Sequence, residues 1–455
     1  MDIIILGGGS SGWMSATYFK KVHPTWNVTV IDSDTVPSKV VGESTTPSFG
    51  TFMALLGYAD ESWMKECSAT YKVGVLYDGW GKGPWFNRFD VRPSPRIVDP
   101  YKDLICTESS KCFVKPMSEE NQHYGLDKTL YPDGPVYMES SCLPYGYHLD
   151  AVAFGVFLKK IGAELGVISI TDHIDTVNYN EDGITNLVSS SGIYSADHYI
   201  DASGFSRVLM SKVSTEPVLK PDAIPPLDKA MVLRKTYINK SEQLKARTKA
   251  TTLSAGWCWE IPLYKDIGCG YVYSSEFITD EEAEAELREA LGDTNNDFEP
   301  FIVPFDCGYY KDVSVLNVTA VGLSAGFIEP LEATSLFMTQ LIIELLDNVL
   351  DGTCGQQEFN NNIDRTFGAF TDFITSNYRY SERTEPFWVR DMPRTEVTTT
   401  WEETGVLSTF YVYGEGTYRQ REYDLNHVFI KSDADEPDLP TQLEILNSGP
   451  YHIRR

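Results

Sequence analysis

The chain has 455 residues, enough for two substantial domains, and its composition of 42% hydrophobic and 23% charged residues is typical of globular proteins. A formal net charge of −27, from 38 basic and 65 acidic residues, repels nucleic-acid phosphates and anionic lipids. No apolar run reaches the roughly 18 residues of a membrane span, so we expect neither nucleic-acid nor membrane binding.

The eight cysteines are scattered along the chain and never form a CxxC pair. This usage is typical of reduced thiols, and no basic segment of a signal peptide precedes the first predicted strand. We therefore expect a cytoplasmic protein. The histidines and cysteines also lack the spacing of metal ligands, so no metal site is predicted.

The N-terminal pattern predicts the start of a parallel, doubly wound sheet. Residues 2–6 form an apolar run that ends at glycines, residues 10–22 have helical periodicity, and residues 28–32 are β-branched and end in an acid. A strand, a glycine turn, a helix and a second strand in this order are typical of α/β proteins.

The pattern changes over residues 80–145, where prolines and aromatic residues interrupt it. We interpret this stretch as an excursion or lid rather than as sheet. Further along, the sequence predicts a helix at 148–165, strands at 167–170, 173–178 and 194–203, antiparallel strands over 227–278, and a long helix at 334–350. The predicted domains are a core of residues 1–350 and a mostly helical substrate-side region of residues 351–455.

A nucleotide fingerprint follows the first predicted strand. The hexapeptide GGGSSG fits the GxGxxG pattern at Gly7, Gly9 and Gly12. Gly7 allows a tight turn, Gly9 lets the backbone approach a pyrophosphate, and Gly12 lets the helix pack on the strand. Ser10 and Ser11 open the helix, whose free N–H groups and positive dipole end face the phosphates.

Three later segments indicate which dinucleotide is bound. Asp32 ends the second predicted strand, where an acid accepts hydrogen bonds from ribose hydroxyls, and this favours FAD or NAD over NADP. YIDASGFSRVL, which contains Asp201, resembles the second nucleotide-contact strand of FAD monooxygenases. VTAVGLSAGFIEPLEATS, which contains Gly322 and Gly326, resembles their flavin-contact strand. The hydroxylases carry Gly-Asp there, whereas this chain has Gly322-Leu323.

Several motifs together resemble the tryptophan halogenase family of flavin enzymes. The best-known family pattern, WxWxIP, is formed here by Trp257, Trp259, Ile261 and Pro262. The resemblance implies an α/β, Rossmann-like FAD-binding monooxygenase fold with an antiparallel sheet and a mostly helical C-terminal substrate region. The acidic, compact sequence is similar to a divergent, virus-encoded member. The matching segments are GGGSSGWMSA, VVGESTTPS, GWCWEIPL, GYVYSS and GFIEPLEATS.

The resemblance also implies two catalytic residues. Lys72 matches the family's lysine, which holds hypohalous acid by a hydrogen bond or as a haloamine, and burial can depress a lysine pKa toward neutrality. Glu332 matches the active-site glutamate, which stabilises the cationic ring intermediate and accepts its proton. Without the match, Lys72 would be interpreted as a solvated lysine at a strand end and Glu332 as an acid at a helix N-terminus. Glu329, three residues earlier, is the residue most easily confused with Glu332.

Halide and flavin contacts are implied in the same way. Thr334 and Ser335 match the pair whose backbone N–H groups bind halide, and a helix N-terminus is a ready anion site. Family members usually have Thr-Gly, so the serine side chain leaves the preferred halide open. Gly42, Glu43 and Ser44 match the strap that links the flavin and halide sites.

The implied reaction is the halogenation of an aromatic substrate through hypohalous acid, with FADH2, O2 and halide, and with a separate flavin reductase as partner. Two alternatives stay open from the sequence. One is an FAD-dependent aromatic hydroxylase, which the missing Gly-Asp and the presence of WCWEIP disfavour. The other is a flavin-binding protein without turnover. A free phenol, an indole and a carrier-tethered ring all remain candidate substrates.

Overall fold

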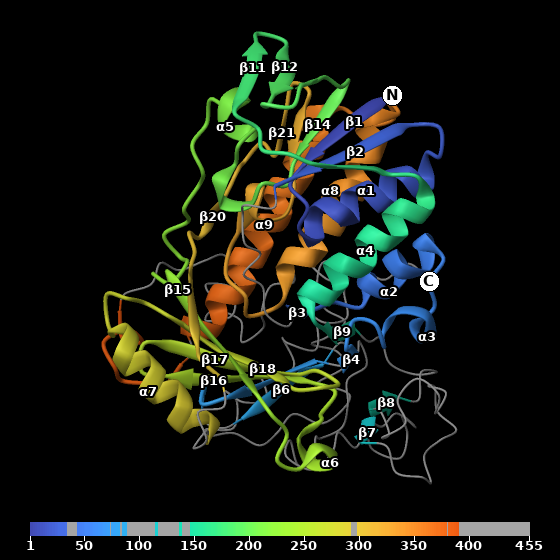
Figure 1. The fold of residues 1–455 in the computed structure, drawn as a ribbon. Coiled ribbons are helices and arrows are strands. Elements are labelled where there is room, and N and C mark those ends of the chain that lie inside the picture. The colour runs from blue at the N-terminus through green and yellow to red at the C-terminus, as the bar shows by residue number, and fades with distance from the viewer. Residues whose placement is uncertain are drawn as a thin grey trace, which may run out of the picture.

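The structure of the chain is a computed structural model that describes residues 1–33, 43–72, 74–81, 84–88, 114–116, 136–138, 146–292, 298–379 and 381–390. A mostly parallel sheet with its helices forms the upper part of the molecule in Figure 1, and a larger, mostly antiparallel sheet forms the lower part. The predicted fold class is thereby confirmed.

The upper sheet is built around the N-terminal strand. Its order is β10-β2-β1-β14-β22-β21, and β1 pairs in parallel with both β2 and β14. Isoleucines fill β1, whose last four residues are buried, because a parallel strand inside a sheet is usually covered on both faces. The strands are β1 (Asp2–Leu6), β2 (Asn27–Asp32), β10 (Ile168–Thr171), β14 (His198–Asp201), β22 (Val318–Ala320) and β21 (Ser314–Val315).

Three helices that pack together cover this sheet. They are α1 (Ser10–Val22), α4 (Ala151–Leu165) and α8 (Thr334–Leu350), and α1 lies against both others (Figure 1). Gly162 lets α4 approach α1 closely, because a Cβ atom there would lie 2.7 Å from the ring of Trp13. At the start of α4, the Asp150 side chain accepts a hydrogen bond from the Ala153 N–H at 2.9 Å, which fixes where the helix begins.

The lower sheet confirms the antiparallel strands predicted over 227–278. Its order is β19-β15-β18-β17-β16-β5-β6. Its strands are β5 (Gly74–Asp78), β6 (Trp85–Arg88), β15 (Lys229–Lys235), β16 (Thr248–Leu253), β17 (Gly256–Pro262), β18 (Ile267–Tyr273) and β19 (Phe301–Pro304). Strand β6 corrects the interpretation of residues 80–145, because residues 85–88 pair with β5 and belong to the sheet. Most of the remaining excursion lies outside the described residues.

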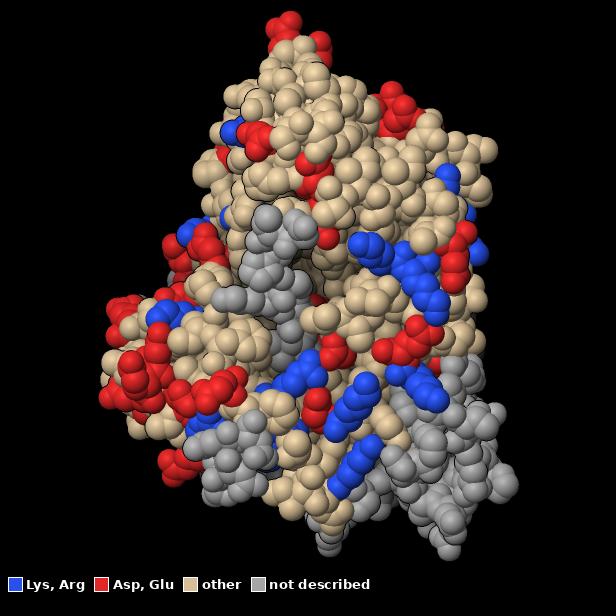
Figure 2. Space-filling model, in the orientation of Figure 1, with Lys and Arg blue, Asp and Glu red and all other residues tan. Residues whose placement is uncertain are grey.

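Helix α7 (Asp280–Leu291) covers one face of the lower sheet. A capping box starts it: Thr279 accepts from the Glu282 N–H, and the Glu282 carboxylate accepts from the Thr279 N–H. Acidic side chains gather over this helix in Figure 2, so part of the chain's negative charge lies on its solvent face.

A small sheet, β3-β9-β4, lies beside the lower sheet and holds one of the predicted catalytic residues. Its strands are β3 (Glu43–Ser44), β4 (Thr70–Lys72) and β9 (Gly146–Leu149). The Thr70 hydroxyl donates to the Pro262 carbonyl at 2.6 Å and joins this sheet to the end of β17.

The remaining elements of the described chain are mostly short, apart from the helix α9. The helices are α2 (Ser48–Leu56), α3 (Asp60–Trp63), α5 (Met210–Val213), α6 (Lys240–Gln243) and α9 (Gln356–Arg379), with 3-10 turns η2 (Gly204–Ser206) and η3 (Gly322–Ser324). The strands are β7 (Val114–Pro116), β8 (Val136–Met138), β11 (Thr176–Asn180), β12 (Gly183–Val188), β13 (Ile193–Tyr194), β20 (Gly308–Tyr309) and β23 (Gly326–Phe327).

The long helix α9 falls in the region predicted to be mostly helical, whereas residues 391–455 lie outside the described part of the chain. The division at residue 350 therefore stays a prediction. Among the described helices, none combines the length and the apolar character needed to cross a membrane.

Candidate active site

The glycine fingerprint has the geometry that its three roles require. Gly7 has φ +114°, and a Cβ atom there would lie 2.3 Å from the Ala202 carbonyl oxygen. A Cβ atom at Gly12 would lie 2.0 Å from the Gly7 carbonyl oxygen. Around Gly9, by contrast, no atom of the described chain comes within 4 Å of the Cβ position. The first and last glycines therefore serve close packing, and the middle one leaves open space before the helix α1.

The surroundings of the fingerprint complete a cradle at the carboxyl edge of the parallel sheet. The Gly8 N–H donates to Asp32 Oδ1 at 3.0 Å, so the acid at the end of β2 also holds the glycine loop. A Cβ atom at Gly322 would lie 2.2 Å from the Ser11 hydroxyl, which in turn lies 3.1 Å from the Thr339 hydroxyl of α8. Open backbone, a helix N-terminus and a strand-end acid fit a dinucleotide with its pyrophosphate beside Gly9.

Asp201 is fully buried and holds the neighbouring loop. Its carboxylate accepts hydrogen bonds from the N–H groups of Leu209 and Met210 and from the hydroxyls of Ser203 and Ser324, at 2.6–3.1 Å. These protein donors account for the carboxylate's acceptor positions. Any contribution of Asp201 to cofactor binding therefore passes through the loop that it holds.

The structure describes three of the four remaining predicted flavin contacts. Gly326 lies against Tyr309, because a Cβ atom there would lie 2.3 Å from the Tyr309 Cβ. Glu43 and Ser44 form β3, and burial raises the pKa of Glu43 to about 7. Gly42 lies outside the described residues.

Lys72 is buried at the end of β4, with 1% of its surface exposed. Burial lowers the pKa of its ammonium from 10.5 to about 8, and the attraction of Glu332 opposes part of that fall. His148, from the neighbouring strand β9, is bonded to Thr248 at 3.0 Å, and burial together with the Lys72 charge lowers its pKa well below the usual range. The structure thus excludes the interpretation of Lys72 as a solvated surface lysine.

Glu332 faces Lys72 from the loop before α8 and is also 1% exposed. Its Oε1 accepts a hydrogen bond from the Tyr77 hydroxyl, which reaches it from β5 of the lower sheet. Two segments more than 250 residues apart thereby meet in one buried site with an ammonium, a carboxylate and a phenol. An ammonium and a carboxylate side by side can hold an electrophile and accept a proton.

The start of α8 has the features of an anion site. The helix begins at Thr334, and Ala333 before it has φ 56° and ψ 41° and provides no side-chain cap. The first turn also lacks acidic residues. Thr334 is buried and Ser335 half-buried. The uncapped N–H groups and the positive end of the helix dipole therefore favour a small anion beside Glu332.

The tryptophans of WxWxIP are core residues, and Trp257 also contacts the loop before α8. Trp257 and Trp259 are 2% and 8% exposed, and their ring centroids lie 6.2 Å apart. The Trp257 indole N–H lies 2.7 Å from the Tyr378 hydroxyl and 3.1 Å from Glu329 Oε2. Glu329, the other acid of this loop, thus joins the loop to β17 and α9. Burial raises the pKa of its carboxyl group to about 8.

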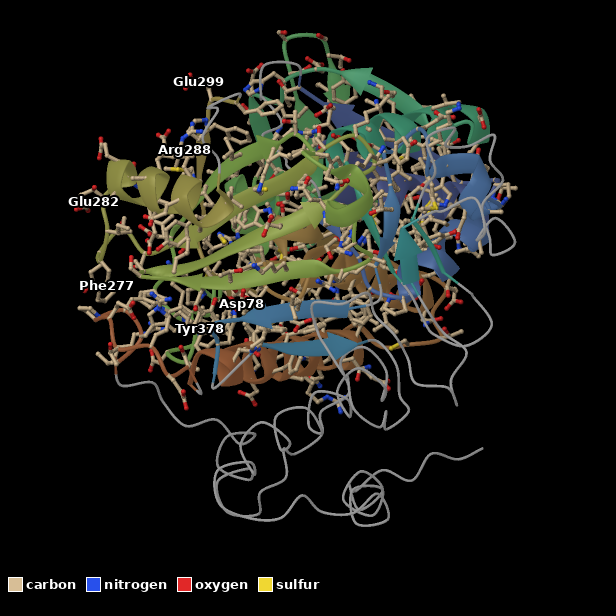
Figure 3. All side chains as sticks on the ribbon, turned by 90° about the horizontal axis from the view of Figure 1, so that it is seen from below. Asp78, Phe277, Glu282, Arg288, Glu299 and Tyr378 are labelled. Atoms are coloured by element: carbon tan, nitrogen blue, oxygen red, sulfur yellow. The ribbon has the colours of Figure 1, made fainter. Side chains whose placement is uncertain are left out.

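Ile261 is buried beside these tryptophans, and Pro262 accepts the hydrogen bond from the strand of Lys72. Further aromatic residues pack nearby: Tyr378 of α9 and Phe277, which follows β18, are labelled in Figure 3, and both pack on Phe387. The predicted residues that the structure describes therefore lie in two groups, one around the glycine fingerprint and one around Lys72 and Glu332, and residues 318–335 join them.

Two residues of the reaction site were not predicted. Tyr77 lies in the same segment as Lys72, ATYKVGVLYDGW, but nothing local identifies its partner 255 positions away. Tyr378 lies in a helix whose amphipathic pattern predicts a buried aromatic face without indicating what that face contacts.

Comparison with known proteins gives a consistent family. A family model described as tryptophan halogenase matches residues 2–419. The tryptophan 7-halogenase RebH of Lentzea aerocolonigenes is 30% identical over 423 residues, which cover 85% of this chain and 78% of that enzyme. The tryptophan 6-halogenase SttH of Streptomyces toxytricini is 31% identical over 371 residues, or 76% and 71% of the two chains. The structure of Tar14, a tryptophan C-6 flavin-dependent halogenase (chlorinase) from taromycin biosynthesis, matches with a TM-score of 0.78 at 25% identity and covers 98% of this chain and 95% of that one.

Proposed function

Since the chain belongs to the tryptophan halogenase family, we propose that Lys72 and Glu332 form the centre at which it halogenates an aromatic ring. The enzyme is a flavin-dependent halogenase, an oxidoreductase that uses FADH2, O2 and a halide. The predictions of family, enzyme class and cofactors are thereby confirmed. The roles of individual residues are part of the proposal.

The chain's own groups prepare the oxidation. Gly7, Gly9, Gly12 and Asp32 hold the dinucleotide, with Gly9 giving the pyrophosphate access to the start of α1. Bound FADH2 with O2 supplies the oxidising power that turns halide into hypohalous acid. The uncapped N–H groups at Thr334 and Ser335 bind the halide, because a helix N-terminus stabilises an anion.

Lys72 and Glu332 carry out the transfer. The Lys72 amine holds the hypohalous acid by a hydrogen bond or as a haloamine, and burial keeps bulk water from competing for it. The halogen adds to a ring carbon, and the ring becomes cationic. Glu332 stabilises that cation and accepts the proton that leaves the same carbon. The ring carbon thus exchanges hydrogen for halogen, and the hypohalous oxygen leaves as water.

The substrate and the supply of FADH2 follow from the same family. RebH and SttH are named for tryptophan, and we propose an aromatic substrate that enters toward the aromatic residues around Tyr378. A separate flavin reductase supplies FADH2. Location in the cytoplasm and a viral origin of the gene stay predictions.

The observation that carries this proposal is that Lys72 and Glu332 are both buried and attract each other electrostatically, with Glu332 two residues before the uncapped start of α8. A mass-spectrometric screen tests it: aromatic compounds are incubated with enzyme, reductase, FAD, NADH and chloride, bromide or iodide in turn. We expect products whose mass follows the halide added. Hydroxylated products that form without halide would favour the hydroxylase instead, and flavin binding without any product would favour a carrier protein.

A further inference from the structure

Tyr77 stands out because its hydroxyl is committed to Glu332. It lies on β5, which pairs with β16 on one side and β6 on the other, so the backbone that carries it is fixed by two neighbouring strands. Its ring is fully buried and packs edge-on against Trp80, with ring centroids 5.5 Å apart. The hydroxyl donates to Glu332 Oε1. The Tyr77 hydroxyl is thus a donor on a fixed strand, and the Glu332 carboxylate that accepts from it lies on a loop.

We propose that Tyr77 is a positioning residue for the halogenation reaction, which holds the Glu332 carboxylate charged and oriented toward Lys72. This inference rests on the proposed role of Glu332. A hydrogen bond from a neutral donor stabilises the charged form of a carboxylate over its protonated form. A fixed donor on one oxygen also restricts rotation of the carboxylate, and the other oxygen is then directed at the reacting ring.

The groups around Glu332 make the prediction specific. Charged or titratable groups that act on Glu332 include Lys72 from β4, Glu329 from its own loop and Tyr77 from β5, and the charge of Lys72 in turn acts on His148 of β9. Lys72 and Glu329 both have a pKa of about 8, and burial keeps His148 neutral over the working range. Lys72 and Glu329 govern the alkaline side. Glu43, whose pKa burial raises to about 7, also titrates on acidification but is the same in the wild type and the variant, so a difference between their acid limbs reports Glu332.

Tyr77→Phe removes the hydroxyl and leaves the ring packing in place. A hydrogen bond to a charged group changes an equilibrium constant by a factor of about 10 to 100. The acid limb of the rate profile should therefore move up by about one to two pH units, while the alkaline limb stays where it is. The KM for halide and the affinity for FAD should not change, because the Tyr77 hydroxyl donates to Glu332 and its ring packs on Trp80.

Tyr271→Phe is a matched control. Tyr271 is a fully buried tyrosine of the same sheet whose hydroxyl donates to Glu286 Oε2 at 3.0 Å, beside α7. Its loss removes a tyrosine–glutamate hydrogen bond on the α7 face of the sheet, together with the bond that the hydroxyl accepts from the Ala255 N–H at 2.9 Å, so it perturbs the sheet at least as much as Tyr77→Phe. If the acid limb moved equally in both variants, general loosening of the sheet would explain the result and the proposal would be overturned.

A double-variant cycle with Glu332→Gln separates this inference from the proposed function. With the glutamine in place, adding Tyr77→Phe should change the remaining rate by less than about twofold, since the two residues act as one unit. Two results would overturn the role of Tyr77 alone. The first is an acid limb in Tyr77→Phe that matches the wild type. The second is a loss of rate on adding Tyr77→Phe to Glu332→Gln that equals the loss it causes in the wild type. Wild-type halogenation by Glu332→Gln itself would overturn the proposed function, and the role of Tyr77 with it.

Discussion

The buried charge of Lys72 should lower the free energy of unfolding of the protein. A fall in its pKa from 10.5 to about 8 means that folding disfavours the charged amine. At about 1.4 kcal/mol for each pH unit, the cost is about 3 kcal/mol, and it already includes the attraction of Glu332. Lys72→Met keeps the length of the side chain and removes the charge. We therefore expect this inactive variant to be more stable than the wild type at pH 7.

The stability difference between Lys72→Met and the wild type should depend on pH. Below pH 8 the lysine is charged in both states, so the wild type bears the full cost. Between about pH 8 and 10.5 the unfolded chain binds more protons, so wild-type stability rises with pH relative to the variant. The advantage of Lys72→Met should therefore be about 3 kcal/mol at pH 7 and should disappear near pH 10.5.

Urea unfolding of the two proteins at pH 7, 8, 9 and 10 measures this difference. Lys249→Met is the control, because Lys249 lies on β16 of the neighbouring lower sheet and pairs with Asp78 at 3.1 Å. Burial lowers the pKa of Lys249, but Glu260 and Asp78 outweigh that effect and leave it raised, so its loss should not stabilise the protein. A Lys72→Met variant less stable than the wild type at pH 7, or a difference that does not vary with pH, would refute the reasoning.

The remaining predictions concern the two ligand sites. Gly9→Val should abolish FAD affinity, measured by quenching of flavin fluorescence, and leave the circular dichroism spectrum unchanged, because its side chain enters open space; normal affinity would show that the cradle is misassigned. Ser335→Gly should keep activity but change the ranking of chloride, bromide and iodide, since the backbone donor survives and only the side chain is lost. Unchanged rankings in both Ser335→Gly and Ser335→Val would contradict the placement of the halide site at the start of α8.

The parallel sheet and the nucleotide cradle were predictable because their signals are local. The run DIIIL, the glycines after it and Asp32 lie within 32 residues, and each residue type has one physical reason to occur there. The antiparallel strands over 227–278 likewise follow from short-range alternation. Helices α1 and α8 begin and end where the periodicity indicates.

The contacts that make the reaction site were not predictable in this way. Strand β16 pairs in parallel with β5, and this pairing brings residues 75–78 beside residues 248–251, which no local pattern indicates. The bond between Tyr77 and Glu332 depends on that long-range packing. Residues 85–88 were misinterpreted because prolines and aromatics nearby hid an edge strand. The roles of Lys72 and Glu332 came from the family resemblance, and the structure adds their burial and their mutual attraction.

The central claim is that oxidation at the flavin and halogen transfer at Lys72 are separate steps. The measurement that tests it most directly is the amount of halogenated product formed for each O2 consumed, compared between the wild type and Lys72→Ala with FADH2, halide and an accepted substrate. We predict that the variant binds FAD and consumes O2 at the wild-type rate but forms almost no halogenated product. Loss of O2 consumption together with product, or an unchanged yield of product per O2, would contradict the assignment of Lys72.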